Sequence, residues 1–204
     1  MANILNYIES FIKTAGLRHL LGLALAIVSF VGTIVICALP QWRVTKIFRE
    51  SSIVASQVFT EGLWKVSSTF SAQIVACKEY ETTLLHISQD LEVARAFIVI
   101  TVIIGVFGIL NGAAGSKFIN FVPDEIEKSK MAMASGVVCL IAGIFVLIPI
   151  CWTTTTIQNN FNNFLPHGTL ELGASLYIGW ITTALLFLGG GLLCSSFICQ
   201  DGTD

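Results

Sequence analysis

The sequence predicts a membrane protein in which four transmembrane helices form a bundle and carry a small antiparallel β-sheet outside the membrane. Apolar residues make up 54% of the chain, charged residues only 12%, and the mean hydropathy is +0.81. A soluble domain usually carries about 25% charged residues. Four long stretches of the sequence contain no charged residue. A helix needs about 20 apolar residues to cross a hydrocarbon core of about 30 Å. A β-barrel is the weaker interpretation, because it requires many alternating segments rather than four apolar blocks.

Each charge-free stretch predicts one spanning helix. The stretches are 20–39, 96–116, 131–152 and 172–200, and the helices are expected at about 20–39, 96–116, 131–152 and 174–199. The first stretch has a cleaved signal peptide as its alternative, but a secretory apolar region is typically 7–15 residues long. This stretch is longer and ends in Pro40-Gln41-Trp42-Arg43, which favours a retained helix.

Lysines in the short connecting segments predict the orientation. The segment 117–130 holds Lys117, Lys128 and Lys130, whereas 153–171 holds no Lys or Arg. Positive charge favours the cytoplasmic side, so both termini and 117–130 are expected there, with 40–95 and 153–173 extracellular. Residues 1–19 read as a short cytoplasmic lead-in, expected as an amphipathic helix lying on the membrane.

The region between the first two helices has a different composition. From Gln41 to Thr83, β-branched and aromatic residues occur in short runs broken by Ser, Thr and Gly. This pattern is typical of a small antiparallel sheet. From Leu84 onward the pattern suits a helix that continues into the second span. Residues 153–161 are polar and uncharged, and are expected to extend the third helix before a turn near Pro166.

Small residues in the second span indicate close helix packing. Gly108 and Gly112 have the spacing that lets helix backbones approach each other. Ordinary packing within the chain is favoured, and a seam between two copies is the alternative.

A set of motifs outside the first span identifies a family. The segment contains Trp42, then Gly62-Leu63-Trp64, then Cys77, and Arg95 at the start of the second span. With the runs 89–95 and 171–180, the sequence resembles the claudins over nearly its whole length. The resemblance implies a left-handed four-helix bundle capped by an extracellular β-sheet. It also implies a structural role for Trp42, Gly62, Leu63, Trp64, Cys77 and Arg95.

The sequence departs from the claudin pattern at three places. Ser67 stands where claudins have the first of two cysteines, which leaves Cys77 without the expected partner. The chain stops at Asp204 without the terminal Tyr-Val that binds scaffold domains, so scaffold binding through the C-terminus is not supported. Phe161 keeps the aromatic residue of the family's second outer segment, and a contact with a claudin on the opposing cell is expected there, although the Pro that usually follows is missing.

Two further sets of residues carry functional expectations. In channel-forming claudins the residues after the second cysteine line the paracellular path, which here are Lys78 and Glu79. Their charges partly cancel, which predicts a barrier or a mild preference for anions; a solvated strand edge is the alternative. Cys194 and Cys199 near the end of the fourth span are candidates for palmitoylation, with buried packing as the alternative.

Nothing in the sequence favours catalysis. The three histidines have no ligands at metal-binding spacing, and no phosphate loop or nucleophile motif occurs, so no enzyme, cofactor or metal is expected. The net charge of −2 gives no reason to expect a nucleic-acid partner.

The resemblance implies a plasma-membrane protein of tight junctions. It would polymerise with claudins in the same membrane, engage claudins on the opposing cell, and form a paracellular barrier or charge-selective pore. The alternatives are a tetraspan auxiliary subunit that modulates a channel or receptor, and a redesigned scaffold that keeps only the fold.

Overall fold

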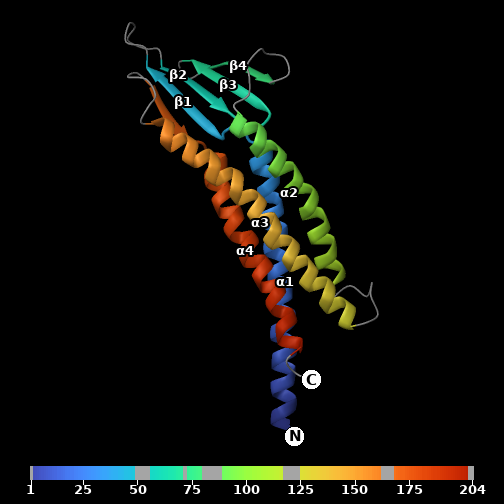
Figure 1. Cartoon of the computed structure of the whole chain (residues 1–204). Helices are drawn as coiled ribbons and strands as arrows, with labels where there is room; N and C mark the ends of the chain where they lie inside the picture. The colour runs from blue at the N-terminus through green and yellow to red at the C-terminus, as the bar shows by residue number, and fades with distance from the viewer. Residues whose placement is uncertain are drawn as a thin grey trace. The chain divides into compact units, whose positions relative to one another are not determined.

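The computed structural model describes residues 2–48, 56–70, 73–79, 89–116, 125–161 and 168–201. In chain order the elements are α1 (Ala2–Ala38), β1 (Arg43–Phe48), β2 (Ser56–Glu61), β3 (Lys65–Phe70), β4 (Gln73–Glu79), α2 (Gln89–Ala114), α3 (Glu125–Phe161), β5 (Gly168–Leu172) and α4 (Ala174–Asp201) (Figure 1). Four long helices and an antiparallel sheet confirm the predicted fold class. The expected helical residues 84–88 and the turn near Pro166 lie outside the described residues.

All four helices are long and apolar enough to cross a membrane. The candidate spans are Gly16–Ala38, Gln89–Ala114, Glu127–Asn159 and Ala174–Ser195. The third contains 33 residues, which corresponds to about 50 Å of helix against a hydrocarbon core of about 30 Å. Helix α3 therefore continues beyond the core. It begins at Glu125, before the charge-free stretch, so the first charged residues of the 125–130 segment already belong to the helix.

The chain divides into two compact units, which we describe separately. The first comprises residues 1–31, 101–144 and 182–204, and its described part is helical. Within it, α2 and α3 approach closely. Ser135 Oγ donates a 2.7 Å hydrogen bond to the carbonyl of Gly108, and a Cβ on Gly112 would lie 2.7 Å from the same hydroxyl. Both glycines of the sequence motif thus contact α3 of their own chain, which supports the intramolecular alternative.

Helix α4 packs in the first unit through consecutive glycines. A Cβ on Gly189 would lie 3.2 Å from the carbonyl oxygen of Gly22, and one on Gly190 would lie 2.9 Å from that of Gly136. Among the described residues, a Cβ on Gly191 would meet nothing within 4 Å. A side chain at Gly189 or Gly190 would therefore crowd the backbone of α1 or α3, whereas one at Gly191 would not crowd any described residue.

The second unit comprises residues 32–100 and 145–181 and contains the sheet. Its five strands are antiparallel in the order β4-β3-β2-β1-β5. Four strands fall in the region 41–83 that the composition assigned to a sheet. The fifth was not predicted, because residues 168–172 were expected only as part of the extracellular segment 153–173, after a turn near Pro166. Pairing with β1, from Arg43↔Leu172 to Ile47↔Gly168, makes this segment a strand.

Candidate functional site

Trp42 lies between the end of α1 and the start of β1 and is completely buried. Its indole Nε1 donates a 2.9 Å hydrogen bond to the carbonyl of Ile36, in the last turn of α1, whose carbonyls lack partners within the helix. Its backbone N–H donates to the carbonyl of Glu61 at 2.8 Å. One residue therefore ties a helix end to the sheet while its ring is buried and its polar atom is satisfied.

The Gly-Leu-Trp motif is the loop of the β2–β3 hairpin. Strand β2 ends at Glu61 and β3 begins at Lys65, and the N–H of Gly62 donates to the carbonyl of Lys65 at 2.9 Å. A Cβ on Gly62 would lie 2.3 Å from Pro40 Cα, so only glycine allows this loop to approach the chain that leaves α1. Leu63, the next residue, is completely buried.

Arg95 holds this hairpin loop onto α2. Its guanidinium donates twice to the carbonyl of Leu63, from Nε at 2.9 Å and from Nη2. The guanidinium carbon also lies 4.6 Å from the ring centroid of Trp64, which is a cation–π contact. Trp64 is 43% exposed, so the cation covers only part of its surface. The structure thus brings together five of the predicted residues, which we call the signature cluster: Trp42, Gly62, Leu63, Trp64 and Arg95.

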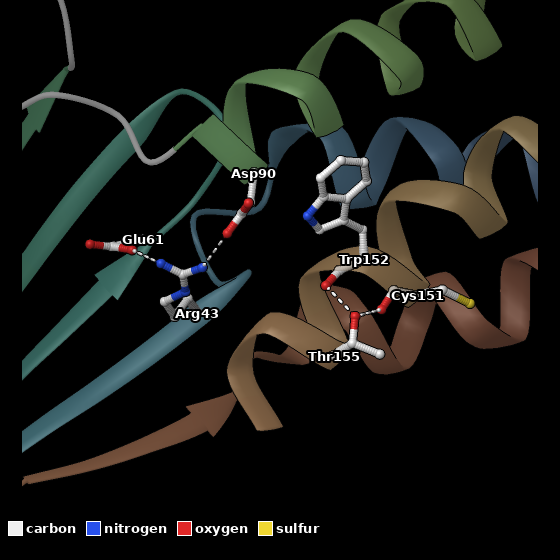
Figure 2. A network of polar contacts seen from close by, with 6 residues as sticks. All are labelled: Arg43, Glu61, Asp90, Cys151, Trp152 and Thr155. Atoms are coloured by element: carbon white, nitrogen blue, oxygen red, sulfur yellow. Dashed lines mark hydrogen bonds and ion pairs between the residues drawn. The ribbon is translucent and has the colours of Figure 1, made fainter. Parts of the chain in front are cut away.

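Arg43 makes a second connection between the sheet and α2. Figure 2 shows its guanidinium between two carboxylates, 3.5 Å from Glu61 Oε2 and 3.4 Å from Asp90 Oδ2. Arg43 and Asp90 have side chains only 12% and 21% exposed, so solvent screens this pair less than a surface pair. This connection was not predicted from the sequence. An acidic residue in the first turn of α2 was the one available signal.

Strand β5 is joined to β1 by side chains as well as backbone. Lys46 Nζ contacts both carboxylate oxygens of Glu171, at 2.6 and 2.7 Å. The N–H of Gly173 donates to the carbonyl of Trp42, and a Cβ on Gly173 would lie 1.9 Å from the carbonyl oxygen of Gln41. The start of α4 is therefore fixed against the residues that precede β1.

Exposed aromatic side chains occur on both α3 and α4 in the second unit. Trp152 on α3 is 53% exposed, and Tyr177 and Trp180 on α4 are also exposed. Such amphipathic rings concentrate at the membrane–water interface. Beyond Trp152, Thr155 donates its hydroxyl to the carbonyls of Cys151 and Trp152 at 2.9 and 2.8 Å (Figure 2). Helix α3 is therefore polar beyond Trp152 but satisfies the Thr155 hydroxyl internally.

The other predicted site residues are placed by their backbone alone. In the β3–β4 register, Ser67 pairs with Cys77, Val66 with Lys78, and Lys65 with Glu79. Phe161 is the last residue of α3, and Cys199 lies in the last turns of α4. The side chains of Cys77, Lys78, Glu79, Phe161 and Cys199 lie outside the described part of the structure.

Cys194, the other candidate for palmitoylation, is described with its side chain. A Cβ on Gly136 would lie 2.7 Å from its sulfur, so the thiol packs against the backbone of α3 within the first unit. This position is consistent with the packing alternative for Cys194.

Comparison with known proteins identifies the chain. A family model described as the PMP-22/EMP/MP20/Claudin family matches residues 17–193. The chain belongs to this family. It is 45% identical over 188 residues to Claudin-4 of Bos taurus, which covers 91% of this chain and 88% of that protein. It is 42% identical over 191 residues to human Claudin-6, covering 93% and 84%. It is also 44% identical over 178 residues to the claudin-like protein ZF-A89 of Danio rerio, covering 86% and 85%.

The family match includes all five residues of the signature cluster and the whole five-stranded sheet. It leaves out residues 1–16, where α1 has already begun. This claudin thus matches its family in 17–193 and carries a helical segment before that region.

Proposed function

We propose that this claudin is a structural component of tight junctions that polymerises into strands and restricts ion flow between cells. Membership of the family over residues 17–193 is the observation that carries this proposal. The signature cluster supports it physically, because it fixes the sheet to the ends of α1 and α2 through buried and charged contacts. A rigid sheet on a membrane anchor suits a barrier built by occlusion. Its partners would be claudins in the same membrane and on the opposing cell.

The decisive experiment is expression in fibroblasts that lack tight junctions, followed by freeze-fracture electron microscopy. Continuous intramembrane strands at cell contacts are the expected result. Surface biotinylation in the same cells separates a delivery failure from an assembly failure. Surface-exposed protein without strands would overturn the polymerisation proposal.

The sheet is proposed to face the extracellular side, with both termini in the cytoplasm. The lysines at 128 and 130 near the start of α3 support this orientation. Antibody access to an epitope tag at either terminus checks it: staining only after permeabilisation is expected, and staining of intact cells would contradict it.

Lys78 is proposed to give the paracellular path a mild preference for anions. Glu79 pairs in register with Lys65, whereas Lys78 pairs with Val66. Because successive strand residues alternate between faces, the two positions fall on opposite faces of the sheet and compensate each other less than neighbours on one face. In the β3–β4 register, the acidic position Glu79 is opposite a cationic residue, whereas the basic position Lys78 is opposite Val66.

Dilution potentials across an epithelial monolayer test this selectivity. Lys78→Glu is expected to shift the permeability ratio toward cations, and Lys130→Glu on α3 is the matched control that should leave it unchanged. Equal ratios for Lys78→Glu and the wild type would contradict the assignment.

Two smaller roles are proposed for residues near the helix ends. Phe161 is proposed to contact a claudin on the opposing cell, since it ends α3 nine residues after the exposed Trp152. Phe161→Ala should reduce strands between cells while leaving complexes within one membrane, measured by co-culture of differently tagged cells.

Palmitoylation is proposed at Cys199, since packing against Gly136 disfavours Cys194. In an acyl-exchange assay, the signal should be lost in Cys199→Ser and kept in Cys194→Ser.

An auxiliary-subunit role is not favoured. The relatives named above are claudins or claudin-like. The proposed role is structural and not enzymatic.

A further inference from the structure

Helix α1 begins well before the region that this chain shares with its family. It runs without interruption from Ala2 to Ala38 (Figure 1), whereas the family match begins at residue 17. The charge-free stretch 20–39 has 20 residues, or about 30 Å of helix, which already matches a hydrocarbon core of about 30 Å. Residues 2–15 form about 21 Å of helix and precede both this stretch and the region that the family model matches.

The sequence of this segment has the period of a two-faced helix. At 100° per residue, the apolar positions cover about one third of the circumference. These positions are Ile4, Leu5, Ile8, Phe11, Ile12 and Ala15. The remaining positions all carry a polar group except Ala2, and they are Ala2, Asn3, Asn6, Tyr7, Glu9, Ser10, Lys13 and Thr14. The apolar sector is wider than the two-position seam of a coiled coil, and it spans only two heptads where a coiled coil needs three or four.

Gly16 lies between the segment and the charge-free stretch, directly before the region that the family model matches. Among the side chains that the structure describes, a Cβ there would meet nothing within 4 Å, whereas a Cβ on Gly22, two turns further on, would lie 2.9 Å from Leu193 Cγ. Packing among these described residues therefore explains Gly22 and does not require Gly16. Glycine inside a helix is destabilising relative to alanine, because it retains backbone freedom that the helix must remove. At this junction the same freedom allows the helix to bend.

We propose that residues 2–15 form a surface helix that bends at Gly16 and inserts its apolar face into the headgroup–acyl boundary of the same membrane. Attachment to a membrane-spanning helix places the whole segment within reach of that boundary. A helix of 14 residues is marginal in water by itself, so burial of its apolar face supplies the stability that its length does not. Glu9 and Lys13 cancel in charge, so the partner is the apolar boundary of the bilayer and not a particular headgroup charge.

Photo-crosslinking from the lipid tests this proposal on the full chain. The protein is reconstituted at one copy per nanodisc in phosphatidylcholine that contains a photoactivatable acyl chain. Irradiation and trypsin digestion should then give lipid adducts on the peptide that ends at Lys13. The paired variant Ile8→Glu/Ile12→Glu should lower adduct yield at least about tenfold, because two charges replace buried apolar groups. The matched control Asn6→Glu/Ser10→Glu adds the same charges to the polar face and should keep the yield within about twofold.

The other outcomes decide against the proposal. An absence of adducts on the wild-type peptide, or an equal loss in both paired variants, would overturn it. Lipid adducts that appear only when each nanodisc holds two copies of the chain would show that the apolar face pairs with a second chain instead. Replacing a third of the lipid by phosphatidylserine, or raising the salt concentration, should leave the yield within about twofold; a strong dependence on either would show that charge, not the apolar face, drives the contact. Gly16→Ala should lower the yield without changing surface delivery of the chain, since the bend becomes costlier while the span is unaltered.

Discussion

Ser67 and Cys77 are directly opposed residues on the neighbouring strands β3 and β4. Opposed residues of an antiparallel pair have Cα atoms about 4.5–5.5 Å apart, within the range that a disulfide can bridge. The claudin resemblance places a cysteine at position 67, so this chain keeps the geometry of the bridge and lacks one of its two sulfurs.

Ser67→Cys is therefore expected to form a disulfide with Cys77 when the sheet lies in an oxidising compartment. Closure of a loop of about ten residues contributes about 3 kcal/mol in the chain-entropy estimate. Thermal unfolding in detergent should show a melting temperature raised by about 5 °C or more, and lowered again by reductant. Ser68→Cys, which faces Ala76 in register, is the control and should give no such rise. An unchanged melting temperature of Ser67→Cys, with the bond between the introduced sulfur and Cys77 verified by mass spectrometry, would refute the prediction.

Arg95→Lys should destabilise the second unit although it keeps the charge. Lysine cannot reproduce the two donations to the Leu63 carbonyl or the planar contact with Trp64. We expect a loss of about 1–2 kcal/mol, measured by thermal unfolding in detergent with Trp fluorescence as a second signal. Lys130→Arg, an exchange at an exposed position, serves as the control. Equal stability of Arg95→Lys and the wild type would show that charge alone holds the hairpin loop.

Gly62→Ala should prevent the sheet from docking on the helix ends. Its Cβ would lie 2.3 Å from Pro40 Cα and 3.0 Å from the carbonyl oxygen of Leu39, and backbone atoms cannot move aside cheaply. A loss of about 2–3 kcal/mol is expected, with the variant retained inside the cell. Gly191→Ala provides the matched control, because its Cβ meets none of the described residues within 4 Å and should be neutral or stabilising by up to about 1 kcal/mol. Surface biotinylation of both variants distinguishes these outcomes.

The Arg43 ion pairs should make unequal contributions. Asp90 is less exposed than Glu61, at 21% against 33%, so solvent screens its attraction to Arg43 less. A double-mutant cycle with Arg43→Gln and Asp90→Asn should give a coupling of about 1 kcal/mol, and the cycle with Glu61→Gln a smaller one. Both couplings should fall at high salt. A larger coupling for Glu61 would contradict the ranking by burial.

The spanning helices were predictable because their signal is local. Charges are so costly in hydrocarbon that their absence over about 20 residues predicts a span by itself. The residues of the signature cluster were also singled out from the sequence, because Trp42, the Gly-Leu-Trp motif and Arg95 resemble the claudin pattern. The sequence did not show which contacts hold the cluster together. Arg95 donates to the backbone carbonyl of Leu63, and a backbone acceptor cannot be recognised from residue types.

Strand β5 and the ion pairs were missed because their cause is distant in the chain. Residues 168–172 contain Gly and Glu, and they become a strand by pairing with β1. Lys46 and Glu171 likewise have no local pattern in common, although their atoms lie 2.6 Å apart. Sequence periodicity describes one element at a time, and these contacts exist only once two elements have met.

The position of β1 between β2 and β5 determines the order in which its two edges can pair during biosynthesis. One edge of β1 can be covered by β2 within a few residues of synthesis, but the other edge waits for a strand that begins at Gly168. At about 5–20 residues per second, the ribosome supplies that strand on the order of ten seconds later. During that interval the nascent chain exposes an unpaired strand edge, which is the feature that quality-control chaperones and neighbouring chains recognise. Cells that produce this claudin in quantity should therefore depend on chaperone protection between the translation of the first and the last strand.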